Sequence, residues 1–261
     1  MSREGSARRM WAIHGPTLTV NTGTMVVGGD ETVTIPLPSF LIEHERGLVL
    51  LDTGLDPRAQ QDPRAVYGDL VDTIGIRFPE DQRLDRQLEA LGFRIEDVTH
   101  VVLSHAHLDH TGGLYQFGHA RLYVGAGELQ YAMWPDALDG HHYRREDLEP
   151  TRGFDWHQLP GDLDLFGDGS IVILRLPGHT PGNQGLLVRL REHTFLLSGD
   201  TVHLHEAVEG RLPMPTDYSS LDARRSIERL VELRDTLPAT LWIGHDVRDA
   251  ARFSFAPHTY E

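Results

Sequence analysis

Short runs of apolar and β-branched residues, broken by turns, dominate the first hundred positions of the chain. They predict strands at residues 10–13, 18–20, 32–35, 40–43, 48–51 and 99–103. Because most of these strands follow one another without an intervening helix, we expect an antiparallel or mixed sheet rather than repeated strand–helix–strand units. Residues 56–82 are polar and contain three prolines, which predicts an irregular segment.

Two stretches have helical periodicity. Three leucines within residues 83–91 recur at spacings of four and three, which predicts an amphipathic helix that ends at Gly92. Ser219, with Asp222 three positions later, is typical of a capping box and predicts the start of a helix over residues 220–237.

The second half of the chain alternates strands and helices again. Further strands are predicted at residues 121–124, 171–176, 185–189, 194–197 and 240–243, a short helix at 127–134, and a polar excursion over the surface at 135–158. The order of the elements predicts one α+β domain over residues 1–261, with two packed sheets and helices outside them.

Metal-binding chemistry is concentrated in the sequence SHAHLDHTGG, which directly follows an apolar predicted strand. It places His105, His107, Asp109 and His110 within six residues. A turn can aim several side chains at one point, whereas a strand sends alternate side chains to opposite faces. Imidazole nitrogens and carboxylate oxygens are the ligands of zinc and similar divalent ions, so we expect a metal site here.

Three later strands end in the same way, with a ligand-type residue next to glycine. These residues are His179, Asp200 and His245. The seven candidates exceed the four ligands of one tetrahedral ion, and they fit two ions if the two oxygens of Asp200 form a bridge. The chain has no cysteine, which excludes thiolate ligands and disulfides. We therefore expect two divalent metal ions per chain, and zinc is the favoured metal.

The charge of the chain limits its partners. Its 39 acidic and 24 basic residues give a formal net charge of −15, which disfavours binding to nucleic acid. No apolar run approaches the length of a membrane span, and no apolar segment typical of a secretory signal follows the first residues. We expect a cytoplasmic protein, monomeric or homodimeric, that acts on a small molecule.

The motifs resemble those of the metallo-β-lactamase superfamily. The matching residues are HAHLDH at 105–110, Gly-His-Thr at 178–180, Gly-Asp at 199–200, Gly-His at 244–245 and Asp-Thr-Gly at 52–54. Within this superfamily, the spacing of the motifs and the ligand set without cysteine are similar to those of N-acyl homoserine lactonases, the quorum-quenching hydrolases. The resemblance implies an αββα sandwich with the metals at one edge of its two sheets.

The resemblance also implies roles for individual residues. One metal would bind His105, His107 and His179, and the other would bind Asp109, His110 and His245. Asp200 and a hydroxide would bridge the two metals, and the hydroxide would attack the lactone carbonyl while Asp109 carries a proton to the leaving oxygen. Those lactonases usually have a tyrosine three residues after the bridging aspartate; this chain has His203, an imidazole that can also donate a hydrogen bond to the substrate.

Apolar residues in otherwise polar segments are the candidate walls of an acyl pocket. They are Met25, Val27, Ile74, Ile76, Phe78 and Trp134. The same fold could instead serve hydrolysis of another ester, a thioester, a phosphoester or a β-lactam. A mononuclear iron persulfide dioxygenase, which needs only three protein ligands, and a metal-binding protein without catalytic activity are two competing interpretations. The acidic charge disfavours a nuclease.

Overall fold

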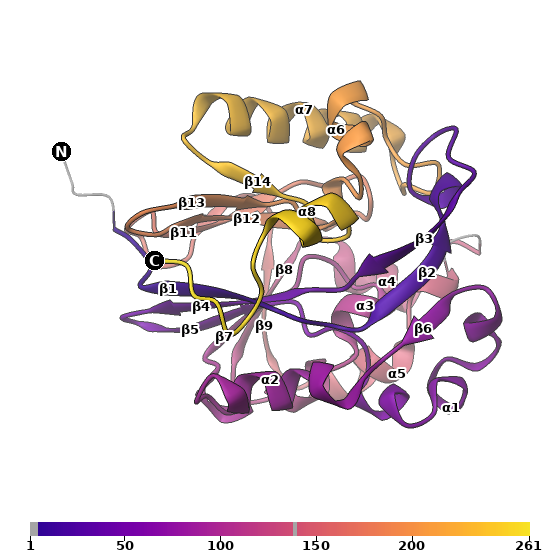
Figure 1. Ribbon diagram of the computed structural model, residues 1–261, viewed down its shortest axis with the longest axis horizontal. Helices are drawn as coiled ribbons and strands as arrows, with labels where there is room; N and C mark the ends of the chain where they lie inside the picture. The colour runs from indigo at the N-terminus through magenta and orange to yellow at the C-terminus, as the bar shows by residue number, and fades with distance from the viewer. Residues whose placement is uncertain (1–4, 138–139) are drawn as a thin grey trace.

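Two β-sheets pack face to face at the centre of the molecule, and helices cover the outer face of each sheet (Figure 1). The computed structural model describes residues 5–137 and 140–261. In Figure 1 the helix α7 (Ser220–Thr236) lies above one sheet and α2 (Leu84–Ala90) below the other. This order of layers confirms the expected αββα sandwich.

The first sheet has six strands, in the order β1 (Arg9–Ile13), β4 (Ser39–His44), β5 (Gly47–Leu51), β7 (His100–Val102), β8 (Arg121–Gly125) and β9 (Asp155–Leu159). The pairs β1–β4 and β4–β5 are antiparallel, whereas the remaining pairs are parallel, so the expected mixed sheet is confirmed. The strand β9 lies in the segment that we expected to be a surface excursion, and that expectation is wrong. It escaped detection because it is a half-exposed edge strand with polar residues at most positions.

The second sheet has five strands, in the order β10 (Leu163–Asp164), β11 (Ile171–Arg175), β12 (Gln184–Arg189), β13 (Thr194–Leu197) and β14 (Thr240–Trp242). Neighbours are antiparallel except β13 and β14, which are parallel. Consequently β11, β13 and β14 run in the same direction, and their carboxyl ends lie at one edge of the sheet.

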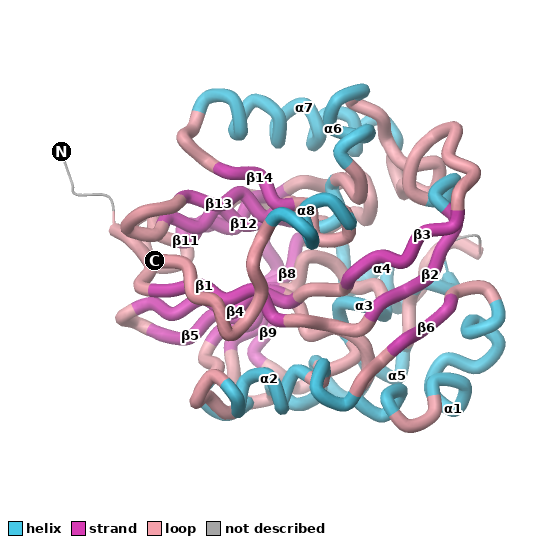
Figure 2. The backbone as a smooth tube through the Cα atoms, viewed as in Figure 1, coloured by secondary structure: helices cyan, strands magenta, loops and turns pink. Residues whose placement is uncertain are grey.

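A third, small sheet contains β3 (Thr32–Pro36), β2 (Thr17–Asn21) and β6 (Gly75–Arg77), in that order. It extends to the right of the two large sheets in Figure 2, where strands are magenta. The strand β6 and the short helix α1 (Pro63–Tyr67) lie in the segment predicted to be irregular, so that prediction is wrong for both elements. Three residues of strand and five of helix are too short to produce a periodic pattern.

The remaining helices are α3 (Leu108–Thr111), α4 (Glu128–Met133), α5 (Arg145–Leu148), α6 (His205–Gly210) and α8 (Val247–Arg252). The hydroxyl oxygen of Ser219 accepts the backbone N–H of Asp222 at 3.3 Å, which confirms the predicted cap of α7. Gly92 follows α2 with a φ of +83°, as expected for a glycine that ends a helix. No helix within residues 5–137 and 140–261 has the length and apolar character needed to cross a membrane.

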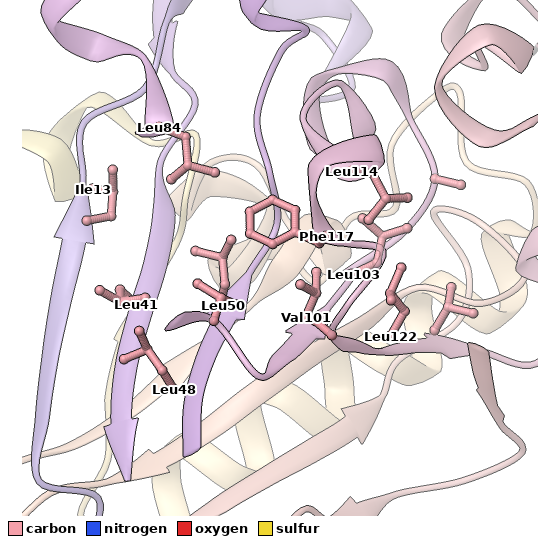
Figure 3. Packing of buried hydrophobic residues seen from close by; sticks show 14 of the residues in the cluster. Ile13, Leu41, Leu48, Leu50, Leu84, Val101, Leu103, Leu114, Phe117 and Leu122 are labelled. Atoms are coloured by element: carbon pink, nitrogen blue, oxygen red, sulfur yellow. The ribbon is translucent and has the colours of Figure 1, made fainter. Parts of the chain in front are cut away.

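Alternation along the strands of the first sheet divides the core into layers. In β4, Phe40 and Ile42 face the second sheet, whereas Leu41 faces α2. Figure 3 shows the outer layer, in which Leu41, Leu50 and Val101 lie together with Phe117. An equivalent layer beneath α7 covers the second sheet. The period-two pattern of the strands thus supplies both faces of each sheet with apolar contacts.

The outer layer beneath the first sheet gives a direct stability prediction. Leu88 of α2 is fully buried in this layer. Replacing it with alanine removes apolar contacts and leaves a cavity, so we expect Leu88→Ala to lower the free energy of unfolding by about 2–5 kcal/mol in urea denaturation. Glu89→Ala, on the exposed side of the same helix, should change it by less than about 0.5 kcal/mol. Equal effects of the two substitutions would contradict this packing.

Candidate metal centre

The candidate ligands follow strands whose carboxyl ends lie at the same edge of the sandwich. In the first sheet, Asp52 follows β5 and the sequence from His105 to His110 follows β7, and these two strands are parallel neighbours. In the second sheet, the residues that follow β11, β13 and β14 are His179, Asp200 and His245. Both sheets therefore contribute side chains to one cluster.

One carboxylate oxygen, Oδ2 of Asp200, lies at the centre of this cluster. Five histidine Nε2 atoms surround it, at 3.0 Å for His203, 3.3 Å for His245, 3.5 Å for His110, 3.7 Å for His105 and 3.7 Å for His179. All five histidines and Asp200 are buried. Such a concentration of imidazoles around a buried carboxylate is a donor set for cations.

Two groups of three candidate ligands in this cluster share no residue. The ligand atoms of His105, His107 and His179 lie within 4.8 Å of one another, as do those of Asp109, His110 and His245. Asp200 forms two further groups of the same size, one with His105 and His110, which come from different sets, and one with His179 and His203. The structure thus brings together all seven residues that the sequence predicted, with Asp200 between the two sets.

The spacing of the donor atoms fits metal ions. Nε2 of His179 lies 3.2 Å from Nδ1 of His107. Two nitrogens bound to one tetrahedral zinc ion, with bonds of about 2.0–2.1 Å, lie roughly 3.3 Å apart. In addition, Nε2 of His105 and Nε2 of His110 are buried and make no hydrogen bond to any described residue. A bound cation would satisfy both nitrogens.

Burial and charge set the protonation of the cluster. Burial lowers the pKa of both His105 and His107 well below the usual value, so these rings are neutral, as metal ligands must be. Burial opposes ionisation of Asp200, but the surrounding histidines hold the pKa of its carboxyl well below the usual value. Burial also opposes protonation of His110, yet the carboxylates of Asp109, Asp200 and Asp52 raise its pKa well above normal. A divalent cation would replace that proton as the counter-charge to the carboxylates.

Asp52 fixes the position of the first ligand segment. Its Oδ1 accepts the backbone N–H of Ser104 at 2.7 Å, and its Oδ2 lies 2.9 Å from Nδ1 of His110. A carboxylate at this nitrogen leaves Nε2 of the ring available to a metal. Asp52 has a φ of +62°, an uncommon conformation for a residue other than glycine. This backbone strain is maintained together with the two contacts of the carboxylate. The Asp-Thr-Gly motif marks Asp52 in the sequence but does not reveal its contact with His110.

Two other candidate ligands are oriented by partners that the sequence does not reveal. Nδ1 of His179 lies 3.3 Å from Oδ1 of Asp217, and Nδ1 of His245 donates to the carbonyl oxygen of Pro36 at 2.8 Å. Asp217 stands in the loop before α7 without a strand or glycine motif, so no sequence signal marks it. These contacts turn Nε2 of each ring toward the cluster.

His203 lies inside the site. It is 6 % exposed, and its ring stacks on that of His245 with 5.2 Å between the ring centroids. It also lines a cavity together with Asp109 and Asp200. Its Nδ1 is buried and makes no hydrogen bond within the described part of the chain. The ring is therefore close enough to the ligands to contact a substrate bound beside them.

A cavity of about 270 Å³ opens beside the cluster. Five candidate ligands, His107, Asp109, His179, Asp200 and His245, line it together with His203. Its other walls contain Leu18, Val20, Asn21, Thr24, Met25, Ile35, Leu70, Thr73, Ile74, Leu108, His141, His142, Met214 and Thr216. The aliphatic walls come largely from the third sheet and the segment around residues 70–74. A flexible apolar chain fits such walls better than a charged group does.

The predicted pocket walls are only partly correct. Met25 and Ile74 line the cavity, whereas Val27 and Trp134 are 61 % and 86 % exposed and do not. The predicted Ile76 and Phe78 pack into the apolar cluster of the third sheet without lining this cavity. Apolar character alone could not separate these cases, because the walls depend on how the third sheet folds over the ligands.

Comparisons with known proteins agree with the geometry. Residues 36–245 match the metallo-beta-lactamase superfamily. An N-acyl homoserine lactonase, AttM of Rhizobium radiobacter, is 35 % identical over 97 % of this chain and 98 % of its own length. A probable metallo-hydrolase of Mycobacterium tuberculosis, Rv2300c, is 32 % identical over 82 % of this chain and 74 % of its own length.

Similarity to solved structures extends over the whole fold. An N-acyl homoserine lactone hydrolase, solved with N-hexanoyl-L-homoserine at its catalytic metal centre, superposes with a TM-score of 0.87 and 22 % identity. The match covers 98 % of this chain and 100 % of that protein. The fold, the ligand cluster and these relatives together show that the chain belongs to the metallo-beta-lactamase superfamily, among the relatives of its N-acyl homoserine lactonases.

Proposed function

We propose that the protein is a dinuclear metal-dependent hydrolase that opens the lactone ring of N-acyl homoserine lactones. The observation that carries this proposal is the shared cavity: the same space is lined by Asp109, Asp200 and His245 and by aliphatic side chains such as Leu18 and Ile35. A substrate with a hydrolysable ring and an apolar tail matches both kinds of wall. The relative AttM, named as an N-acyl homoserine lactonase, supports this choice of substrate.

The proposed ligand sets are His105, His107 and His179 for one ion and Asp109, His110 and His245 for the other, with Asp200 shared. Two divalent ions, zinc being our choice, would supply a water nucleophile active at neutral pH and would polarise the lactone carbonyl. Because Asp52, Asp217 and the Pro36 carbonyl fix three of the rings, the ligands need little rearrangement to bind metal.

The chain's own side chains divide the remaining work. Asp109 lines the cavity. Burial acts to raise the pKa of its carboxyl, but His110 and His245 outweigh this effect and hold the pKa below the usual value. It is therefore ionised and can accept a proton from the attacking water and pass it to the departing ring oxygen. His203 can donate a hydrogen bond to the carbonyl oxygen as negative charge develops there. The aliphatic walls would hold the acyl chain.

Competing functions are less compatible with the site. A mononuclear dioxygenase would require three protein ligands and would give Asp109, His110 and His245 no function as a second set. A metal-binding protein without activity is disfavoured by the complete set of candidate ligands for two ions. Turnover of a panel of homoserine lactones, thioesters, aryl esters and phosphoesters tests the substrate class. Efficient cleavage of another class, with no lactone opening, would refute the lactonase proposal.

We expect two metal ions per fully active chain. The reason is that two sets of three ligands share one carboxylate. Elemental analysis of the purified protein should give a metal-to-protein ratio near two, with zinc as the main metal. Removal by a chelator should abolish activity, and added divalent metal should restore it. A fully active protein with one ion per chain would contradict the dinuclear proposal.

Acyl-chain length should affect binding through the aliphatic walls. Each additional buried methylene contributes about 0.8 kcal/mol, so KM should fall roughly fourfold per methylene until the cavity is full. Ile74→Trp should narrow the cavity and selectively impair long-chain lactones in steady-state assays. Val27→Trp is the matched control, because Val27 is exposed and lies outside the cavity walls. Identical chain-length profiles for wild type and Ile74→Trp would refute this assignment of the pocket.

A further inference from the structure

One fully buried carboxylate lies outside the ligand set and yet contacts two of its loops. Glu128 begins α4 and has no solvent exposure. Its Oε1 accepts the backbone N–H of Ala106 at 2.8 Å, and its Oε2 accepts the N–H of Gly182, also at 2.8 Å. Ala106 stands between His105 and His107, and Gly182 follows His179 by three residues. A single side chain thus joins the two segments that carry one complete ligand set.

We propose that Glu128 is a positioning residue that fixes the distance between the His105–His107 turn and the His179 loop. The three imidazoles belong to two segments that are distant in sequence. His105 and His107 follow a strand of the first sheet, and His179 follows a strand of the second. Their nitrogens must nevertheless keep a separation within a few tenths of an ångström of the metal-binding value. The carboxylate of Glu128 supplies a short and rigid connection between the two backbones.

The surroundings of Glu128 make this connection stiff. A Cβ atom placed on Gly125 would lie 2.0 Å from the carbonyl oxygen of Gly182, so the two backbones are in direct contact. The guanidinium of Arg175 donates to the carbonyl oxygens of Ala126 and Pro181, at 3.3 and 3.1 Å. The His179 loop is therefore held firmly against the start of α4, and Glu128 extends this support to Ala106.

The chemistry of the contact allows a substitution of equal size. An ionised carboxylate has two acceptor oxygens, which match the two N–H donors. In Glu128→Gln, only one acceptor oxygen remains, and the amide NH₂ group must face either Ala106 N–H or Gly182 N–H. One of the two loops loses its anchor, while the volume of the side chain is kept.

Zinc affinity, measured with the apoprotein by competition with a chromophoric chelator, tests the proposal independently of any substrate. We expect Glu128→Gln to bind one of the two zinc ions about 10–100-fold more weakly and the other with wild-type affinity. Leu88→Ala is the matched control, because it destabilises the fold from α2, which supplies no residue to the candidate ligand groups, and should retain both affinities. Wild-type affinity for both ions in Glu128→Gln, or an equal loss in Leu88→Ala, would overturn the positioning role.

A second measurement needs no variant. In the wild-type apoprotein, the amides of Ala106 and Gly182 should exchange with deuterium as slowly as amides of the central strands. Exchange as fast as that of exposed loops would overturn the proposal even if Glu128→Gln does not fold.

The inference rests on the proposed ligand set and not on the lactone substrate. A wild-type protein that binds fewer than two zinc ions would overturn that set and this inference together, whereas a different substrate would leave both in place.

Discussion

Replacing Asp200 with alanine is expected to abolish metal binding and turnover together. Oδ2 of Asp200 lies between five histidine nitrogens, and among the described residues no other carboxylate joins a ligand group that draws on both proposed sets. Substitution of groups that merely orient ligands typically costs about 10–100-fold, so loss of the shared ligand should cost more than about a hundredfold in kcat/KM. Elemental analysis and kinetics on the same preparation measure both effects.

Two histidines outside the cluster serve as controls for Asp200→Ala. His14 and His258 are exposed and belong to none of the candidate ligand groups. His14→Ala and His258→Ala should keep two ions and wild-type turnover. An Asp200→Ala protein with full metal content and full activity would eliminate the bridging role.

The His203→Ala substitution should have the second largest effect, and it should act on chemistry rather than on metal content. Its ring is buried beside Asp200 and lines the cavity, but it belongs to neither of the two proposed ligand sets. Loss of one hydrogen-bond donor to the developing oxyanion typically lowers turnover by about a hundredfold or more. We therefore expect kcat to fall by roughly that factor while two ions are retained, as measured by kinetics and elemental analysis.

The tyrosine variant separates a donor role from a packing role. A phenol hydroxyl at this position can donate the same hydrogen bond, so His203→Tyr should retain substantial activity. Wild-type kcat in His203→Ala would show that the ring has no part in the reaction. Loss of metal from His203→Ala would assign the ring to metal binding instead of oxyanion stabilisation.

The ligand cluster was readable from the sequence because its residues follow strands with a strong apolar pattern. His179, Asp200 and His245 each stand beside a glycine at the end of such a strand, and parallel strands bring these ends to one edge. The partner of His179 was not readable, since Asp217 approaches from a loop whose path depends on the packing of α7. Glu128 was equally hidden, because a glutamate near the start of a short helix normally indicates a solvated side chain.

The difference between residues with a local sequence pattern and residues placed by tertiary contacts also explains the errors in the predicted fold and pocket. The strands β6 and β9 are held by neighbours rather than by their own pattern, and both are partly exposed. For the pocket, Met25 and Trp134 have similar apolar character in the sequence, yet only Met25 lies under the third sheet. Tertiary contacts decide such cases, and local sequence carries little information about them.

The small sheet of β3, β2 and β6 is separate from the two large sheets in its strand pairing. It supplies Leu18, Val20 and Ile35 to the cavity but none of the seven candidate ligands. In the proposed function, recognition and chemistry thus reside on different parts of the scaffold, and the hydrogen bond from His245 to Pro36 joins these parts. Mutations that diversify this sheet can alter the range of accepted molecules while the reactive machinery stays intact, an organisation that favours evolutionary change of specificity over change of reaction.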